Sequence, residues 1–412
     1  MVLVRENNVV IDAKNWKKEL ISKKLEIFYN PVMKFNRDCS VLLLNALSEI
    51  NKNPKEDNQK DCKENLQEDI KEKSKNMLIA MPLAGSGIRG LRFLKELKKG
   101  IIDEIHFNDY KEDFTGMMKK NLKLNKLKKN KKIVIHNTDA NLFLLNSSGF
   151  DYIDIDPFGT PNPFLDSAVK RISRGGIIAV TATDTSALAG TYPLATKRKY
   201  FATPMLNYLM HELGLRILVR KVQMIGGQYD KALLPIFSYA KDHYYRIFFK
   251  CEKGKTRVDK ILAKHNYFLY CDCIDFFVDN CNNFVCKKCK KKMQFAGPLW
   301  TGMLFDKNII EKMREEDYAA VIGKENKEEI NLFEMLIKEG VSKGASNKED
   351  IVGFYEIPEI MSKYKISKSI KMNELIERIE TSGYNAVRTH FGKQGIKSDI
   401  SVSALVKIMK EF

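Results

Sequence analysis

The sequence has no long apolar run and few cysteines for its size. No apolar stretch approaches the length needed to cross a bilayer, and Arg5 and Glu6 interrupt the N-terminus where a signal peptide would have its apolar core. Eight cysteines in 412 residues are too few for a disulfide scaffold. These absences argue against membrane-spanning and disulfide-rich secreted proteins, and they predict a cytoplasmic location with no membrane partner.

Acidic residues are also scarce relative to basic ones. The chain holds 52 Asp and Glu against 70 Lys and Arg, which gives a formal net charge of +18. Such an excess favours a polyanionic partner, most commonly nucleic acid. The alternative is a solvated, lysine-rich surface with no partner. No protein partner is evident from the sequence.

Short apolar runs alternate with helical patterns over the first 250 residues. Before residue 51, residues 16–25 and 38–50 have helical spacing, whereas residues 51–76 lack large apolar side chains and predict an exposed insertion. Strands alternating with helices favour a mostly parallel, doubly wound α/β sheet. The predicted strands are 77–80, 104–107, 132–136, 152–155 and 176–181, with helices at 91–98, 114–127 and 164–173 and closing strands at 216–224 and 244–249.

The pattern changes after residue 250. Helical stretches at 308–314 and 328–338 and a run over 357–382 precede an alternating segment at 383–403, which predicts a hairpin. We therefore expect two domains: residues 1–250, and residues 251–412 as a smaller α+β or winged-helix-like domain.

A glycine-rich loop follows the first strand of the predicted sheet. Gly85-Ser86-Gly87-Ile88-Arg89-Gly90 has G-x-G-x-x-G spacing, which suits a nucleotide cofactor at a helix N-terminus. Asp109 ends the second strand, where a carboxylate can accept hydrogen bonds from ribose hydroxyls of a nicotinamide cofactor or of adenosylmethionine. Asp139 ends the third strand and could accept from an adenine amino group. An acid there favours a methyltransferase, although a helix N-cap is the alternative for Asp139.

The fourth strand ends in Asp154-Ile155-Asp156-Pro157-Phe158-Gly159. An exocyclic amine on a nucleobase is a poor nucleophile because its lone pair is delocalised into the ring. A carboxylate and a backbone carbonyl that accept its N–H bonds counter this delocalisation and stabilise the charge that develops during transfer. Proline fixes the turn and the aromatic ring offers a stacking face. The stretch resembles the acid-Pro-Pro-aromatic signature of enzymes that methylate amino groups on aromatic bases. This resemblance implies an S-adenosyl-L-methionine-dependent amino methyltransferase with a Rossmann-like class I fold.

The sequence resembles the tRNA (guanine-26 N2)-dimethyltransferases, as an archaeal-type member. The likeness spans nearly the whole chain and is carried by 28–31, 36–38, 84–90, 154–160, 181–184, 229–230, 242–244, 297–300, 388–391 and 395–397. It implies tRNA as the partner and Asp156, Pro157 and Phe158 as the residues that hold the guanine amino group. The cofactor contacts implied by the glycine loop and by this likeness are Phe28, Arg37, Gly85, Gly87, Arg89, Asp109, Asp139 and Ala140. For Arg37 a surface salt bridge is the alternative.

Five cysteines lie close together, namely Cys271, Cys273, Cys281, Cys286 and Cys289. Some members of the family carry two C-x-x-C pairs and others none. Cys286 and Cys289 form such a pair, whereas Cys271 and Cys273 are one residue short. Cys271, Cys273, Cys286 and Cys289 could bind a structural zinc ion, with Cys281 as a substitute ligand. Buried thiols without a metal are the alternative.

The target base would have to leave its stack inside folded tRNA. Lysine-rich residues 117–132 and Lys197-Arg198-Lys199 are candidate RNA contacts, with a solvated face as the alternative for the former. Tyr384 and Phe391 could support RNA or belong to the core. Three other functions stay open: amino methylation of DNA or another RNA, RNA binding without catalysis, and nicotinamide-dependent oxidoreduction.

Overall fold

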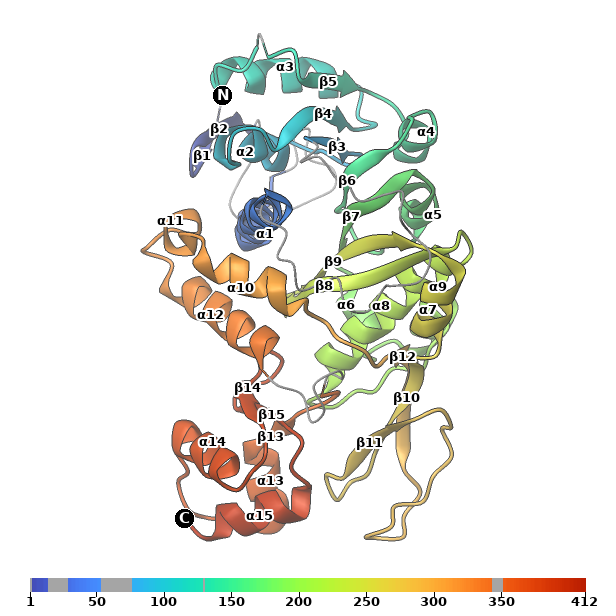
Figure 1. The fold of residues 1–412 in the computed structure, drawn as a ribbon, viewed down its shortest axis with the longest axis vertical. Coiled ribbons are helices and arrows are strands. Elements are labelled where there is room, and N and C mark those ends of the chain that lie inside the picture. The colour runs from blue at the N-terminus through green and yellow to red at the C-terminus, as the bar shows by residue number, and fades with distance from the viewer. Residues whose placement is uncertain (1, 14–28, 53–75, 129, 343–350) are drawn as a thin grey trace. The chain divides into compact units, whose positions relative to one another are not determined.

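A seven-stranded sheet is the main element of the fold (Figure 1). The computed structural model describes residues 2–13, 29–52, 76–128, 130–342 and 351–412. The strand order is β5-β4-β3-β6-β7-β9-β8, and β3 pairs in parallel with β4 and β6. The strands are β3 (Met77–Met81), β4 (Ile102–Asn108), β5 (Ile133–His136), β6 (Phe150–Ile155), β7 (Ile172–Ala182), β8 (Lys231–Lys241) and β9 (Tyr244–Lys253). The expected mostly parallel α/β fold is confirmed.

The chain divides into two compact units. Unit 1 comprises Met1–Asp156, Lys170–Ala179 and Asn308–Ile330, and unit 2 comprises Pro157–Val169, Val180–Lys307 and Asn331–Phe412. The segments of the two units alternate along the chain. The expected domain boundary after residue 250 stays a prediction.

Most predicted helices are present in the described residues. Residues 16–25 lie outside them, as do residues 53–75 of the predicted insertion. The first eight helices are η1 (Pro31–Met33), α1 (Lys34–Lys52), α2 (Ile88–Glu96), α3 (Phe114–Leu124), α4 (Ala140–Leu145), α5 (Asn162–Arg171), α6 (Thr185–Leu188) and α7 (Pro193–Tyr200). The later helices are α8 (Met210–Gly227), α9 (Lys255–Leu262), α10 (Lys307–Glu315), α11 (Tyr318–Ile322), α12 (Lys327–Val341), α13 (Ile357–Tyr364), α14 (Met372–Thr381) and α15 (Val402–Lys410).

Strand β3 lies where the strand order of unit 1 reverses. The chain runs from β3 outward to β4 and β5, which are parallel, and then returns to add β6 on the other side of β3. Ile79 and Ala80 of β3 are fully buried, as expected for a central strand covered on both faces. Ligands of open α/β sheets bind beyond the carboxyl ends of the strands at such a reversal.

The prediction of a strand at residues 216–224 is wrong, because this segment is the second half of α8. Its β-branched residues Ile217, Val219 and Val222 resemble a strand, but each of them is fully buried. A helix buried on several sides does not show a single apolar stripe. The i,i+4 ion pair of Glu212 with Arg216 (2.9 Å) was the helical signal in the sequence.

Strand β8 was not predicted, and it pairs antiparallel with β9. Pro235 lies in its middle, and a proline cannot donate a hydrogen bond to a neighbouring strand. The structure accommodates it because β8 is the last strand of the sheet and the register shifts between Pro235 and Phe237. The predicted strand at residues 244–249 is confirmed as part of β9.

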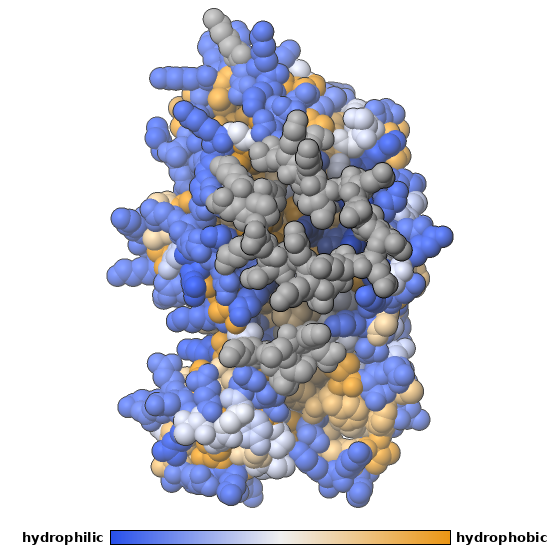
Figure 2. Space-filling view, viewed as in Figure 1, coloured by the Kyte–Doolittle hydropathy of each residue, from blue (hydrophilic) through white to orange (hydrophobic). Residues whose placement is uncertain are grey.

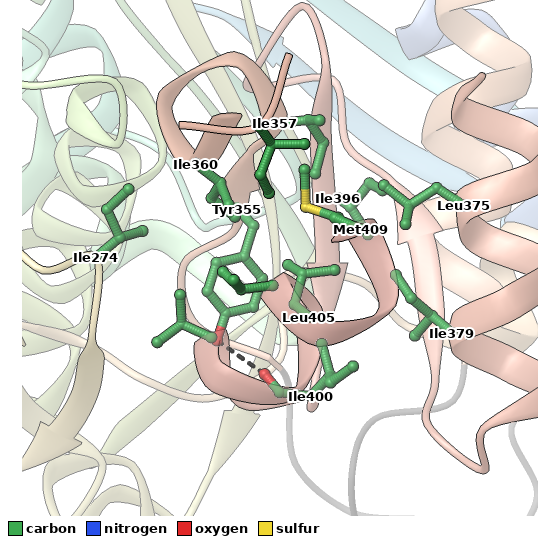
Figure 3. Packing of buried hydrophobic residues seen from close by; sticks show 13 residues of the cluster. Ile274, Tyr355, Ile357, Ile360, Leu375, Ile379, Ile396, Ile400, Leu405 and Met409 are labelled. Atoms are coloured by element: carbon green, nitrogen blue, oxygen red, sulfur yellow. Dashed lines mark hydrogen bonds between the residues drawn. The ribbon is translucent and has the colours of Figure 1, made fainter. Parts of the chain in front are cut away.

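The C-terminal part of unit 2 is a small α+β arrangement, as expected. Its sheet has the order β13-β15-β14, from β13 (Tyr355–Glu356), β14 (Ala386–Arg388) and β15 (Gly395–Ser398). Isoleucine and leucine side chains from α13, α14, β15 and α15 pack into one core, which Figure 3 shows from close by. The hydroxyl of Tyr355 donates to the carbonyl of Ile400 (2.8 Å) inside this core. Phe391 is buried, which favours its core interpretation, whereas Tyr384 is exposed.

The described residues also form two other small sheets. β1 (Leu3–Glu6) and β2 (Val9–Asp12) form a hairpin in unit 1. β10 (His265–Tyr270) lies between β11 (Phe276–Asp279) and β12 (Gln294–Trp300) in unit 2. Among the described helices, none combines the length and the apolar character of a membrane span. The visible face in Figure 2 is mostly hydrophilic, in keeping with the many lysines.

Candidate active site

Glycine is needed at one position of the loop between β3 and α2 and at one position of the first turn of α2. Gly87 has a left-handed φ of 76°, and a Cβ on it would lie 2.4 Å from the sulfur of Met118. A Cβ on Gly90 would lie 2.3 Å from the ring of Phe107 on β4. The first glycine therefore permits the turn and the second permits close packing of α2 on the sheet. The N-terminus of α2 consequently faces the carboxyl end of β3, where a nucleotide cofactor would lie.

The acid at the end of β4 reaches this glycine loop. The amide of Gly85 donates to Oδ2 of Asp109 (2.9 Å), so two residues predicted to bind the cofactor are in contact. The neighbouring Asn108 donates to the carbonyls of Pro82 and Thr138 (both 3.0 Å) and fixes the loops after β3 and β5 beside it. These contacts hold the Asp109 carboxylate at the carboxyl edge of the sheet.

Asp139 is the N-cap of α4. Its Oδ1 accepts hydrogen bonds from the amides of Asn141 (2.8 Å) and Leu142 (3.2 Å), and Ala140 behind it is buried. The alternative interpretation of this residue as a helix cap is therefore what the structure shows. The cap uses Oδ1 of the carboxylate. A contact between Oδ2 and the adenine of the cofactor stays a prediction.

Arg89 contacts the predicted catalytic carboxylate. Its guanidinium pairs with Asp156 and lies 3.4 Å from Oδ1 of Asp154. It also donates to Oδ1 of Asn36 (2.8 Å) and to the hydroxyl of Ser40 (2.9 Å) on α1. Arg89 is buried, whereas the Asp156 side chain is 21% exposed. The structure thus joins a residue predicted to bind the cofactor to one predicted to bind the target amine.

Arg37 is part of a buried ion network rather than a surface salt bridge. Its Nε donates to Oε1 of Glu6 (2.7 Å), and its Nη2 pairs with the other oxygen of Glu6 and donates to the carbonyl of Asn30 (3.1 Å). Burial raises the pKa of Glu6, but the guanidinium groups of Arg37 and Arg92 outweigh it and lower that pKa to about 2. Glu6 is consequently ionised at neutral pH. Phe28, the other predicted contact from this part of the chain, lies outside the described residues.

Three residues beside the site were missed by sequence reasoning. Glu6 gives no local signal, because its partner Arg37 is 31 residues away in the sequence. Asn36 and Asp154 belonged to the stretches that carry the family likeness, but no role was assigned to them. For Asn36 and Asp154 a signal existed, because each is a polar side chain within two residues of one already singled out, Arg37 and Asp156.

The loop that follows Asp156 belongs to unit 2 and is held from the end of β7. The amide of Gly159 donates to the hydroxyl of Thr183 (2.7 Å), and the amide of Thr183 donates to the carbonyl of Gly159 (2.9 Å). Gly159 has a positive φ of 83°. Phe158 is 38% exposed. The paired backbone segments fix the turn after Pro157 and leave the aromatic ring accessible.

The buried Tyr200 also contacts the loop that follows Asp156. The hydroxyl of Tyr200 on α7 lies 3.0 Å from the hydroxyl of Thr160 and donates to the carboxylate of Asp184 (2.8 and 2.9 Å). Burial and then Asp184 raise the pKa of Tyr200 well above its usual range, so the phenol stays protonated. The side-chain amide of Asn162 donates to the carbonyl of Lys199 (3.0 Å). Helix α7 is therefore attached directly to the loop.

The four cysteines predicted as metal ligands come together in unit 2. The Sγ atoms of Cys271, Cys273, Cys286 and Cys289 all lie within 4.8 Å of one another. Hydrogen bonds from the backbone amides of Cys289 and Lys288 lower the pKa of Cys286 to about 7. Four thiols at such distances fit a tetrahedral zinc ion, which prefers four sulfur ligands at about 2.3 Å. Cys281 is exposed and is not a member of the group.

The fold and the site are those of a class I methyltransferase. Its features are a Rossmann-like sheet, a glycine loop in contact with Asp109, and Asp156-Pro157-Phe158 at the end of β6. The family model for N2,N2-dimethylguanosine tRNA methyltransferases matches residues 5–410. The chain therefore belongs to this family.

Named relatives are similar in sequence to this chain over nearly its full length. The chain is 36% identical over 397 residues to the tRNA (guanine(26)-N(2)/guanine(27)-N(2))-dimethyltransferase of Aquifex aeolicus, covering 95% of this chain and 91% of the relative. It is 33% identical to the tRNA (guanine(26)-N(2))-dimethyltransferase of Pyrococcus horikoshii, covering 98% and 99%. The structure of Trm1 from Pyrococcus horikoshii in complex with S-adenosyl-L-methionine superposes with a TM-score of 0.77 at 32% identity over 99% of both chains.

Proposed function

We propose that this protein transfers methyl groups from S-adenosyl-L-methionine to the N2 amino group of guanosine 26 in tRNA, giving the monomethyl and then the dimethyl product. The observation that carries this proposal is the match of the family over residues 5–410, with Asp156-Pro157-Phe158 at the end of the strand next to β3. Its partner is tRNA, and its location is the cytoplasm.

Residues at the carboxyl ends of β3, β4 and β5 would hold the cofactor. The glycine loop at Gly85 and Gly87 lets the cofactor approach the backbone, and Asp109 accepts hydrogen bonds from the ribose hydroxyls. Asp139 and Ala140 would contact the adenine. Phe28, Arg37 and Arg89 would make the remaining contacts with the cofactor. When bound, the cofactor supplies a methyl group activated by the sulfonium charge. The electropositive N-terminus of α2 and the carboxylates around it would orient the bound molecule.

The target amine lies at the loop after β6. The carboxylate of Asp156 and the carbonyl of Pro157 accept its two N–H bonds, which localises the nitrogen lone pair and aims it along the transfer direction. The ring of Phe158 stacks on the guanine. Arg89 holds Asp156 in place, because the guanidinium is anchored on α1 through Asn36 and Ser40. The proton released after transfer passes from the amine to Asp156 or to solvent.

The residues of 251–412 form the tRNA-binding domain in this proposal. Cys271, Cys273, Cys286 and Cys289 hold a structural zinc ion, which closes the loops next to β10 and β11. The support is the mutual closeness of the four sulfur atoms and the burial of Cys271 and Cys286. Metal analysis of the purified protein, with Cys286→Ser as the variant and exposed Cys281→Ser as its matched control, tests this assignment.

The decisive experiment incubates the protein with labelled S-adenosyl-L-methionine and unmodified tRNA transcripts, followed by nucleoside analysis. We expect N2-methylguanosine and then N2,N2-dimethylguanosine, and no label when guanosine 26 is replaced by adenosine. Label that survives this replacement would place the target elsewhere in the tRNA. Label in DNA or ribosomal RNA but not in tRNA would support the competing amino methyltransferase.

A further inference from the structure

Helix α7 presents an unusual surface. Tyr192, Leu194, Phe201 and Leu206, hereafter the α7 patch, are each 63–67% exposed, although they are large apolar side chains. Gly190 lies against Leu206, since a Cβ built on it would be 3.4 Å from the Cβ of Leu206, which connects the two ends of the segment. Isolated apolar residues on a surface need no explanation, but a group of four within one short segment marks an interaction site.

The exposed face of α7 combines apolar and basic residues in one stripe. Leu194, Lys197 and Arg198 follow i, i+3, i+4 spacing, which places them on the same side of α7. Phe201 is the C-cap residue of this helix and has a left-handed φ of 53°. Thr196 and Tyr200 on the other side are fully buried. The Nζ of Lys221 lies 4.9 Å from the ring centre of Phe201 and adds a further positive charge. A partner must therefore offer both flat apolar surface and negative charge.

The buried face of α7 is fixed to the loop that receives the target base. Tyr200 bonds to Thr160 and Asp184, and the carbonyl of Lys199 accepts from Asn162. The exposed stripe is thus held rigidly next to the loop that begins at Asp156. The nucleotides next to a base delivered to this loop are therefore the candidates for contact with α7. A second copy of this chain is a poorer fit, because three consecutive basic residues would face a protein with a net charge of +18.

We propose that the α7 patch receives the tRNA nucleotides adjacent to the extruded target guanosine. Tyr192 and Phe201 stack on their exposed bases, and Lys197 and Arg198 contact the phosphates. The stacking replaces the contacts that the RNA loses when the target leaves its stack, so the patch acts as a wedge that stabilises the extruded state. This inference rests on the proposed function.

The test compares two tRNA transcripts in kcat/KM measurements. One is intact, and in the other the nucleotide that pairs with the target is abasic, so that the target is already unpaired. Loss of one base stack, worth about 1–3 kcal/mol, corresponds to about 5- to 140-fold in binding. We expect Phe201→Ala to lower kcat/KM by about this factor on intact tRNA and by less than about 3-fold on the abasic transcript. Phe201→Trp should retain activity on both, and Leu3→Ala, which truncates an exposed leucine on β1, should change neither.

Each outcome is distinguishable. Equal loss on both transcripts, or no loss on either, would overturn the wedge while leaving the proposed function intact. Conversion of a wild-type dimer into a monomer by Phe201→Ala in sedimentation experiments would also overturn it, because the patch would then be a self-association surface. A wild-type protein that methylates neither transcript would refute the proposed function itself.

Discussion

Both units bury a network of charged side chains, but the two networks lie in different surroundings. In unit 1, Glu6 binds Arg37 and Arg92, and Arg92 also pairs with Asp38 (2.6 Å) and Glu96 (2.8 Å). This network joins β1, α1 and α2. Asn36, next to Arg37 on α1, is a partner of Arg89, which pairs with Asp156.

In unit 2, Glu212 of α8 pairs with Arg216 and with Lys397 of β15 (2.8 Å). Lys397 lies 3.6 Å from Glu339 of α12, which accepts from Nδ1 of His390 (2.7 Å). This network connects α8 and α12 to the C-terminal sheet and contains none of the residues predicted to bind cofactor, amine or metal. We therefore expect similar buried ion pairs to support the candidate site in one unit and the fold in the other, and variants should separate the two roles.

The largest effect on stability is expected for Lys397→Met. Removing the ammonium leaves Glu212 and Glu339 buried with one partner fewer, which costs about 3–5 kcal/mol. Denaturant unfolding should show this loss, whereas calorimetry on the folded fraction should show unchanged S-adenosyl-L-methionine affinity. Lys393→Met, at an exposed position of the same hairpin, is the control and should change neither quantity. Reduced cofactor affinity in Lys397→Met would erase the distinction between the two networks.

The opposite result is expected for Asp156→Asn. The amide keeps the size of the side chain but loses the charge that faces the developing positive charge on the amine. We expect kcat to fall by roughly 100- to 1000-fold, as for other groups that stabilise transition-state charge. Cofactor affinity should stay within about 3-fold. Asp103→Asn, an exposed acid on β4, is the matched control. Unchanged kcat in single-turnover assays would remove Asp156 from the chemistry.

The sequence predicted the strands and the residues at their ends better than it predicted the partners of the buried charged residues. The strands of unit 1 and the residues at their ends could be predicted, because short apolar runs alternate with helical patterns there. Asp109 directly follows β4, Asp156 directly follows β6, and Asp139 comes three residues after β5. The partners of the charged residues could not be predicted. Arg89 meets Asn36 across 53 residues of sequence, and such a pairing depends on tertiary packing. Helix α8 was misread as a strand because it is buried on several sides.

Stability should fall at acid pH through both networks. The pKa of Glu6 and that of Glu339 are each lowered to about 2 from an ordinary 4.5, since burial is outweighed by facing cations. A carboxyl group whose pKa is lower in the folded than in the unfolded protein stabilises the fold at any pH above its unfolded-state pKa. This stabilisation is lost as the pH falls from about 5 toward 2. Each group contributes up to about 3 kcal/mol. Glu6→Gln and Glu339→Gln should each flatten the pH dependence of unfolding between pH 5 and 3. A variant with the slope of the wild type would show that its carboxyl does not titrate with folding.

The smallest effect separates the two roles of Asp139. Its Oδ1 caps α4, and Asn caps equally well, so Asp139→Asn should keep the stability that Asp139→Ala loses, about 1 kcal/mol. If the second oxygen accepts from the adenine amino group, the amide replaces that acceptor by a donor, and cofactor affinity should fall about 10-fold in Asp139→Asn. Asp317→Asn at the N-cap of α11 is the matched control, with both quantities unchanged. Calorimetry that finds wild-type affinity in Asp139→Asn would leave Asp139 as a helix cap, because a cap that also bound adenine could not tolerate a donor there.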